Sequence, residues 1–219
     1  MAHSIQRIDT ENDLKAGIEA LSQQDPVIAR LVAEGAIPQM RLREGGFSGL
    51  CWIITGQQLS TASANAIWQR LVSHLGEVSH EQFISSPEED LRKLGLSQGK
   101  IKTMRAVAEA VIENRLPIEQ LAQIEAQEAH NLMTAIHGIG PWTADLYLLS
   151  CIGHTDVFPA GDLALQEAYR IAYGYPHRPS AKEITELSLK WRPWRAVAAR
   201  ILWAYYRQVK ARDGVMSTN

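Results

Sequence analysis

The sequence predicts an all-α protein, and three observations support this prediction. Apolar residues recur with helical periodicity along most of the 219 residues, and no stretch alternates between apolar and polar side chains as a half-buried strand does. Serines and prolines stand where the periodic stretches begin. The connections are short and contain no low-complexity tract. The chain is long enough for one large domain or for two small lobes.

The helices expected in the first half have recognisable ends. Pro26 and Pro87 suit a first helical turn, where a missing N–H breaks no intrahelical hydrogen bond. Ser60 and Ser97 are good N-caps, and Gly95 suits a C-terminal stop. The expected ranges, in order, are Glu11–Gln23, Pro26–Glu34, Phe47–Gln57, Thr61–Leu75, Pro87–Leu94 and Gln98–Asn114.

The helices expected in the second half are defined in the same way. Pro141 and Pro193 suit first-turn positions, and Asp162 precedes an apolar-periodic run as an N-cap does. The expected ranges, in order, are Ile118–Ala122, Ala126–Ile136, Pro141–Ile152, Leu163–Tyr173, Ala181–Leu189 and Pro193–Lys210.

The composition excludes several classes of protein. Hydrophobic residues make up 46% and charged residues 21%, as in an ordinary globular domain. No apolar run reaches the roughly 18 residues of a membrane helix, and the N-terminus lacks the apolar region of a secretory signal. Cys51 and Cys151 are too few for a zinc or iron–sulfur framework, so we expect buried thiols. We expect an intracellular protein without a membrane partner.

The charge is segregated along the chain although the formal net charge is only −2. Residues 106–169 hold one basic residue against nine acidic ones, and residues 170–212 hold ten of the 22 Lys and Arg. A second basic cluster comprises Arg92, Lys93, Lys100, Lys102 and Arg105. Such segregation fits a basic face for nucleic acid, and it fits solvated helix surfaces equally well.

The segment "HGIGPWTADLYLL" at 137–149 places a tight turn directly before a helix. Gly138 and Gly140 allow backbone conformations that are closed to other residues, and Pro141 begins the next helix. The amides of the turn and the positive end of the helix then point outward together, which suits a phosphate. A helix–turn–helix hairpin used for packing alone has the same shape.

Four motifs make the hairpin reading more specific. They are "ITGQQLS" (54–60), "GIGPWTADLYLL" (138–149), "DVFPAGDLAL" (156–165) and "WRPWRAVAARILW" (191–203). In this combination and order the chain resembles the helix-hairpin-helix (HhH-GPD) DNA glycosylases, most closely the 3-methyladenine DNA glycosylase II, or alkylpurine glycosylase, branch. The resemblance covers roughly Phe47 to Lys210, and His137 replaces the family's usual proline. It implies a two-lobed helical fold with the active site between the lobes.

The resemblance also implies the reaction and its catalytic group. Asp162 matches the family's catalytic aspartate, and a carboxylate stabilises the oxocarbenium-like sugar formed as a glycosidic bond breaks. A helix cap is the alternative role, and the two are compatible because helix amides keep a carboxylate ionised. Trp142 stands where strand-cleaving relatives carry a lysine. Since Schiff-base chemistry needs an amine, we expect base removal without AP-lyase activity.

Two tryptophans are expected to line a pocket for an extruded base. Trp142 matches a pocket residue of the family, with a core aromatic as the alternative. Trp203 lies opposite the apolar stripe of its helix, which comprises Trp194, Val197, Ala198, Ile201, Tyr205 and Val209. It stands among small and basic residues: Ala196, Ala199, Arg200, Arg207 and Lys210. By resemblance it forms a pocket wall that stacks on a cationic base, with packing against a second lobe as the alternative.

The remaining site residues come from the turn motifs. By resemblance Gln57 and Gln58 approach DNA at the lesion, with Gln58 at the wedge position; the alternative for Gln57 is bonding to local backbone. Further DNA contacts are expected from the hairpin residues Gly138, Ile139, Gly140 and Thr143. No cofactor is required, although relatives bind a monovalent cation that would here meet the carbonyls of Thr134, Ile136 and Ile139.

Together these features predict a monomeric base-excision-repair enzyme that flips alkylated purines out of double-stranded DNA and excises them by hydrolysis of the N-glycosidic bond. The alternatives are a glycosylase for deaminated or oxidised bases and a non-catalytic DNA-binding hairpin module. The expected organisation is an N-terminal segment, 1–46, packed on the C-terminal lobe; a central lobe, 47–122; a hairpin and catalytic lobe, 123–212; and a tail, 213–219.

Overall fold

A computed structural model gives the fold and describes residues 7–40 and 42–216. These residues form helices and no strand, apart from an isolated bridge between Arg7 and His154, so the all-α prediction is confirmed. The chain divides into two compact units. Unit 1 combines the segment up to Leu42 with the chain from Gly153 onward, and unit 2 spans Arg43–Ile152. Within the described ranges, no helix combines the length and apolar character needed to cross a membrane.

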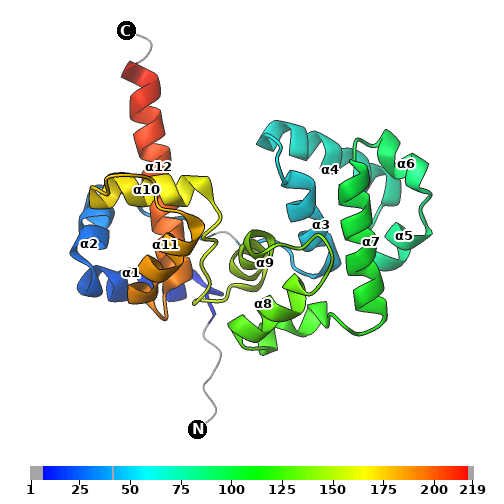
Figure 1. Cartoon of the computed structure of the whole chain (residues 1–219), viewed down its shortest axis with the longest axis horizontal. Coiled ribbons are helices and arrows are strands. Elements are labelled where there is room, and N and C mark those ends of the chain that lie inside the picture. Colours follow the sequence, from blue (N-terminus) through cyan, green and yellow to red (C-terminus); the bar gives the residue numbers. More distant parts are fainter. Residues whose placement is uncertain (1–6, 41, 217–219) are drawn as a thin grey trace. The chain divides into compact units, whose positions relative to one another are not determined.

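Unit 1 is built around α12, which packs against α1, α2 and α10 (Figure 1). Both ends of the described chain therefore contribute to one core. The helices of unit 1 are α1 (Glu11–Gln24), α2 (Pro26–Ala33), α10 (Leu163–Tyr173), α11 (Ala181–Ser188), the 3-10 turn η3 (Leu189–Trp191) and α12 (Arg195–Met216).

Unit 2 is built around α7, which packs against α3, α5 and α6 (Figure 1). Its helices are α3 (Gly46–Gly56), α4 (Thr61–Leu75), α5 (His80–Ser85), α6 (Glu88–Lys93), α7 (Gln98–Ile112), η1 (Ile118–Gln123), α8 (Ala126–Thr134), α9 (Pro141–Tyr147) and the π turn η2 (Leu148–Ile152). Cys51 and Cys151 are buried in this unit, as expected, and burial raises the pKa of both thiols.

Most of the expected helix ends are confirmed. Ser60 and Ser97 accept backbone N–H bonds as N-caps, and Pro141 occupies the first turn of α9. Two prolines differ from expectation: Pro87 is the N-cap of α6, and Pro193 precedes α12, which begins at Arg195. The expected helix to Ile152 ends at Tyr147 and continues as the π turn η2.

One helix, α5, is absent from the expected set. It has only six residues, too few for a periodic pattern, and it depends on one cap and one anchor. Ser79 accepts a bond from the Gln82 amide at 3.3 Å, and Phe83 is fully buried. The sequence signal for this helix is Ser79 followed four positions later by the aromatic residue Phe83.

The expectation of a single apolar stripe on α12 is wrong for the first half of the helix. Ala196, Ala199 and Arg200, which were expected on the opposite face, are also buried. The reason is that α12 is the central helix of unit 1 and is surrounded by α1, α2, α10 and η3.

The expected domain boundaries also differ from the units. The boundary at 123 falls inside unit 2, because α9 packs on α3 and α8 packs on α9. Residues 213–216 of the expected tail continue α12, and residues 217–219 lie outside the described chain, as do residues 1–6 and 41 of the N-terminal segment.

Candidate functional site

Asp162 is the N-cap of α10 in unit 1. Its Oδ1 atom accepts hydrogen bonds from the amides of Ala164 at 2.9 Å and Leu165 at 3.0 Å. The helix N-terminus therefore places partial positive charge beside the carboxylate and fixes its direction. The predicted cap is confirmed, and it leaves room for a second role at the same group.

Trp203 of α12 lies beside this carboxylate. Its indole Nε1 donates to Asp162 Oδ1 at 3.3 Å, and its ring is half-buried. The two residues are 41 positions apart in the chain and come from neighbouring helices. The structure thus brings together two of the residues that the sequence singles out for base removal.

Ion pairs of Asp156 with Arg192 and Arg195, here called the clamp, hold the segment that leads to Asp162. Asp156 accepts from Arg195 Nε at 2.6 Å and from Arg192 Nε at 2.8 Å, and the Arg195 guanidinium also donates to the Asp156 carbonyl at 2.7 Å. The Ala196 amide donates to the Thr155 carbonyl at 2.8 Å. The segment is therefore fixed to the start of α12, the helix that carries Trp203.

The sequence did not reveal this clamp, because its partners lie 36 and 39 residues apart and the charge pattern assigns the arginines to a basic face. In the part of the chain that the structure describes, at least four of the ten basic residues between 170 and 212 are ion-paired inside unit 1: Arg170 with Glu167, Lys190 with Asp25, and Arg192 and Arg195 with Asp156. Fewer charges of this segment are therefore available to a nucleic acid than the sequence indicates.

The hairpin belongs to unit 2 and joins α8 to α9. Gly138 has φ +86°, and a Cβ atom there would lie 2.0 Å from Thr103 Oγ1 of α7. Glycine is therefore required both by conformation and by the close packing of the turn on α7. No side-chain hydrogen bond caps α9 at Gly140, and the Thr143 amide donates to the Gly140 carbonyl at 3.0 Å, so a phosphate site at this turn remains a prediction.

These contacts predict a large loss of stability on substitution of Gly138 and a small change on substitution of Gly140. Gly138→Ala should destabilise the protein by about 2–3 kcal/mol, because it adds both a clash and an unfavourable φ. Gly140→Ala should change the free energy of unfolding by less than about 1 kcal/mol, because nothing lies within 4 Å of a Cβ atom there. Urea unfolding of the two variants measures the difference, and equal losses would contradict the steric account.

The tip that follows α3 is anchored on two sides. Gln57 Nε2 donates to Thr143 Oγ1 at 2.8 Å, and Lys100 Nζ donates to the Thr55 carbonyl at 2.7 Å. The bond to Thr143 replaces the local backbone bond considered for Gln57. Thr143 itself is buried, so a direct DNA contact by its side chain remains a prediction. Gln58 is exposed and has φ 58°, a left-handed backbone conformation that is uncommon for a residue other than glycine.

One of the three carbonyls considered for a cation takes part in the turn. The Ile136 carbonyl accepts from the Ile139 amide at 3.1 Å, and each carbonyl oxygen has a second lone pair. Thr134 closes α8, with its hydroxyl donating to the His130 carbonyl at 2.9 Å. A monovalent cation on the carbonyls of Thr134, Ile136 and Ile139 remains a prediction.

The remaining pair of expected residues is divided between the units. Trp142 is half-buried at the start of α9 in unit 2, and Trp203 belongs to unit 1. A pocket with both rings as walls therefore remains a prediction.

Comparison with known proteins gives the family. Residues 51–193 match the HhH-GPD superfamily of base excision DNA repair proteins; this range includes the hairpin and Asp162, and Trp203 lies beyond it. DNA-3-methyladenine glycosylase 1 of Schizosaccharomyces pombe is 32% identical over 154 residues, which cover 68% of each chain. DNA-3-methyladenine glycosylase of Bacillus subtilis is 27% identical over 169 residues, and this chain spans 56% of its length.

Solved structures show the same relationship. The S. pombe 3-methyladenine DNA glycosylase Mag1, in complex with abasic DNA, superimposes with a TM-score of 0.77 at 30% identity, over 86% of this chain and 95% of that one. A DNA-3-methyladenine glycosidase from Bacillus halodurans gives a TM-score of 0.79 at 29% identity, with 94% of both chains covered. The chain belongs to the HhH-GPD superfamily of base excision DNA repair proteins.

Proposed function

We propose that this chain is a DNA glycosylase that flips alkylated purines of the 3-methyladenine type out of double-stranded DNA and hydrolyses their N-glycosidic bond. The single observation that carries the proposal is the Asp162 carboxylate, held by two helix amides with the Trp203 indole 3.3 Å away. The carboxylate meets the N–H edge of the indole, so a base stacked on the ring face would lie next to the sugar cation that the carboxylate stabilises. The activity named for the S. pombe relative supports the substrate class.

The chemistry requires little beyond this pair. Alkylation leaves a purine ring positively charged, so the base departs as a neutral molecule when the bond to C1′ breaks and both electrons move to the ring. The sugar becomes an oxocarbenium-like cation, which Asp162 stabilises. Water then adds to C1′ and loses a proton, and an abasic site remains. The Trp203 ring, rich in π electrons, favours a cationic base.

The proposed enzyme does not cleave the strand. Trp142 occupies the hairpin position where an amine would be needed for a Schiff base, and no lysine lies between Lys102 and Lys182. We propose that it acts as a monomer on damaged double-stranded DNA. A monovalent cation on the carbonyls of Thr134, Ile136 and Ile139 would order the turn without taking part in hydrolysis.

The test is excision from duplex DNA that carries N-alkylated purines. Wild-type protein should release the free alkylated base, and strand breaks should appear only after alkali treatment. Breaks without alkali would contradict the absence of lyase activity. DNA binding without base release would overturn the substrate class, and duplexes with deaminated or oxidised bases would then separate a different glycosylase from a non-catalytic binding module.

Trp203 provides a second prediction with a built-in comparison. Trp203→Ala should lower kcat/KM by about 10- to 100-fold, because stacking on one base contributes about 1–3 kcal/mol. Trp203→Phe keeps a stacking face and loses only the N–H bonded to Asp162, so it should retain most of the activity. Single-turnover excision at several enzyme concentrations checks both variants, and equal losses in the two would contradict a stacking role.

A further inference from the structure

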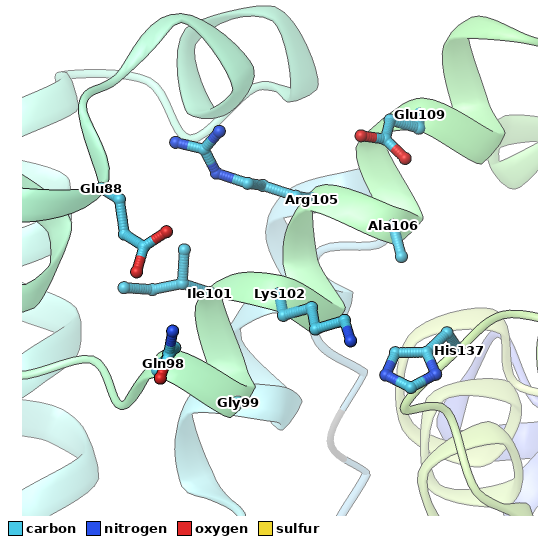
Figure 2. Close-up of a pocket in the computed structure, with 9 residues that line it drawn as sticks. All are labelled: Glu88, Gln98, Gly99, Ile101, Lys102, Arg105, Ala106, Glu109 and His137. Carbon is cyan, nitrogen blue, oxygen red and sulfur yellow. The ribbon is translucent and has the colours of Figure 1, made fainter.

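A groove of about 660 Å³ lies on unit 2 beside the hairpin turn. Figure 2 shows that α7 supplies most of its lining, with Glu88 on one side and His137 of the turn on the other. Neither Asp162 nor Trp203 is among the residues that line it.

Two basic side chains converge in this groove. Figure 2 shows the Lys102 ammonium and the His137 imidazole pointing toward one another, and both residues are exposed. Among the residues that the structure describes, neither side chain makes a hydrogen bond or an ion pair. Two convergent N–H donors with no acidic group between them suit an anion with two accessible oxygens, such as a phosphodiester.

The other charged groups of the groove are directed elsewhere. Arg105 donates to the Ser86 carbonyl at 2.8 Å and points toward the side that carries Glu88. Glu109 stands almost two turns further along α7 than Lys102. The basic pair therefore lies at the end of the groove next to the hairpin, and the acidic residues flank it.

The packing of the turn fixes the basic pair relative to the hairpin amides. Gly138 is pressed against Thr103, and these two residues directly follow His137 and Lys102 in the chain. The contact that seats the turn on α7 thus also places the pair beside it. Successive phosphates of one DNA strand are separated by only about 3.4 Å along the helix axis, so a strand bound at the turn brings a neighbouring phosphate to the groove.

We propose that Lys102 and His137 bind the DNA phosphate next to the one held by the hairpin turn. This inference rests on the proposed function and on the expectation that the hairpin turn binds a DNA phosphate. It assigns the pair a role in positioning the strand and none in the hydrolysis itself.

The test is the salt dependence of affinity for a duplex with a stable abasic-site analogue. Lys102→Gln should weaken binding about fivefold and reduce the slope of log K against log salt by about 0.9, the value for one phosphate contact. His137→Ala should weaken binding about threefold. The matched control is Lys93→Gln, an exposed lysine of the same unit whose ammonium pairs with Glu89 and Asp90 at 3.2 Å, and its slope should stay at the wild-type value.

Neutral methylphosphonates locate the contact. One phosphate of the lesion strand is replaced at a time, and DNA affinity is measured for wild type and variants. At one position, the replacement should leave wild type and Lys102→Gln with the same affinity, because the phosphate that Lys102 contacts has lost its charge. At the neighbouring position, which the hairpin turn contacts, the replacement should lower the affinity of wild type and variants by the same factor. An unchanged slope for Lys102→Gln, or an equal change for Lys93→Gln, would overturn the inference while the proposed function stands. Wild-type protein that neither binds nor excises would overturn both.

Discussion

Asp162→Asn is expected to lower the rate of base excision by about 100- to 1000-fold while leaving DNA affinity within a few-fold of wild type. The reason is that asparagine keeps an oxygen for the helix amides but loses the negative charge that stabilises the sugar cation. Asparagine is also among the best N-caps, so α10 should stay folded. Single-turnover excision measures the rate, and binding to an abasic-site analogue measures the affinity.

A variant at another helix cap separates the effect of losing the Asp162 charge from the effect of losing a helix cap. Ser180 caps α11 of the same unit, with its side chain accepting from the Glu183 amide at 3.3 Å. Ser180→Ala should cost about 1 kcal/mol of stability and leave excision unchanged. Asp162→Ala should show both the loss of stability and the loss of rate. Excision by Asp162→Asn at the wild-type rate would eliminate the proposed role of this carboxylate.

Asp25→Ala is expected to have the largest effect on stability, roughly 3 kcal/mol or more. Oδ1 of Asp25 caps α2 by accepting from the Val27 amide at 2.9 Å. Oδ2 accepts from Tyr173 OH at 2.7 Å, from the Trp191 indole at 2.9 Å and from Lys190 at 2.8 Å. Because Trp191 is fully buried, removal of the carboxylate leaves its N–H without an acceptor.

The same cluster predicts how stability depends on pH. Burial alone would raise the pKa of Asp25, but the hydrogen bonds from Lys190, Trp191 and Tyr173 outweigh it and lower the pKa from 3.8 to about 2. A lowered pKa means that the folded state favours the ionised form, a contribution of about 2 kcal/mol that is complete above pH 4. It should be lost as the pH falls from about 4 to 2.

Urea unfolding between pH 7 and pH 2 checks both statements about Asp25. Wild type should lose this increment of stability in the acidic range, and Asp25→Asn should lack it at every pH. The control is Asp13→Asn, an exposed carboxylate in the capping box of α1 that should cost no more than about 1 kcal/mol. If the Asp13 and Asp25 variants lost the same free energy of unfolding, burial of the Asp25 carboxylate would not explain its contribution to stability.

The sequence predicted the parts of this protein that depend on neighbouring residues. Helix caps such as Ser60 and Ser97 act on amides two or three positions away, so their signal is local. The cap at Asp162 was predictable for the same reason, and the family resemblance added its proposed chemistry.

Interactions between distant segments were not predictable. The clamp of Asp156 on Arg195, the bond of Gln57 to Thr143 and the seat of Gly138 on Thr103 each join positions 35 or more apart. Periodicity also failed for α12, because a helix that is covered on several sides needs no single apolar stripe. The isolated pattern of a sequence does not show which partners surround a helix.

The discontinuity of unit 1 has a consequence for synthesis on the ribosome. Unit 2 is one continuous segment, so its core can close while the chain is still growing, as contiguous domains do. The apolar faces of α1 and α2 emerge first but must wait for α12, their last partner, to leave the exit tunnel. We expect the Asp162 carboxylate and the Trp203 indole to meet only at that final stage, after unit 2 has folded.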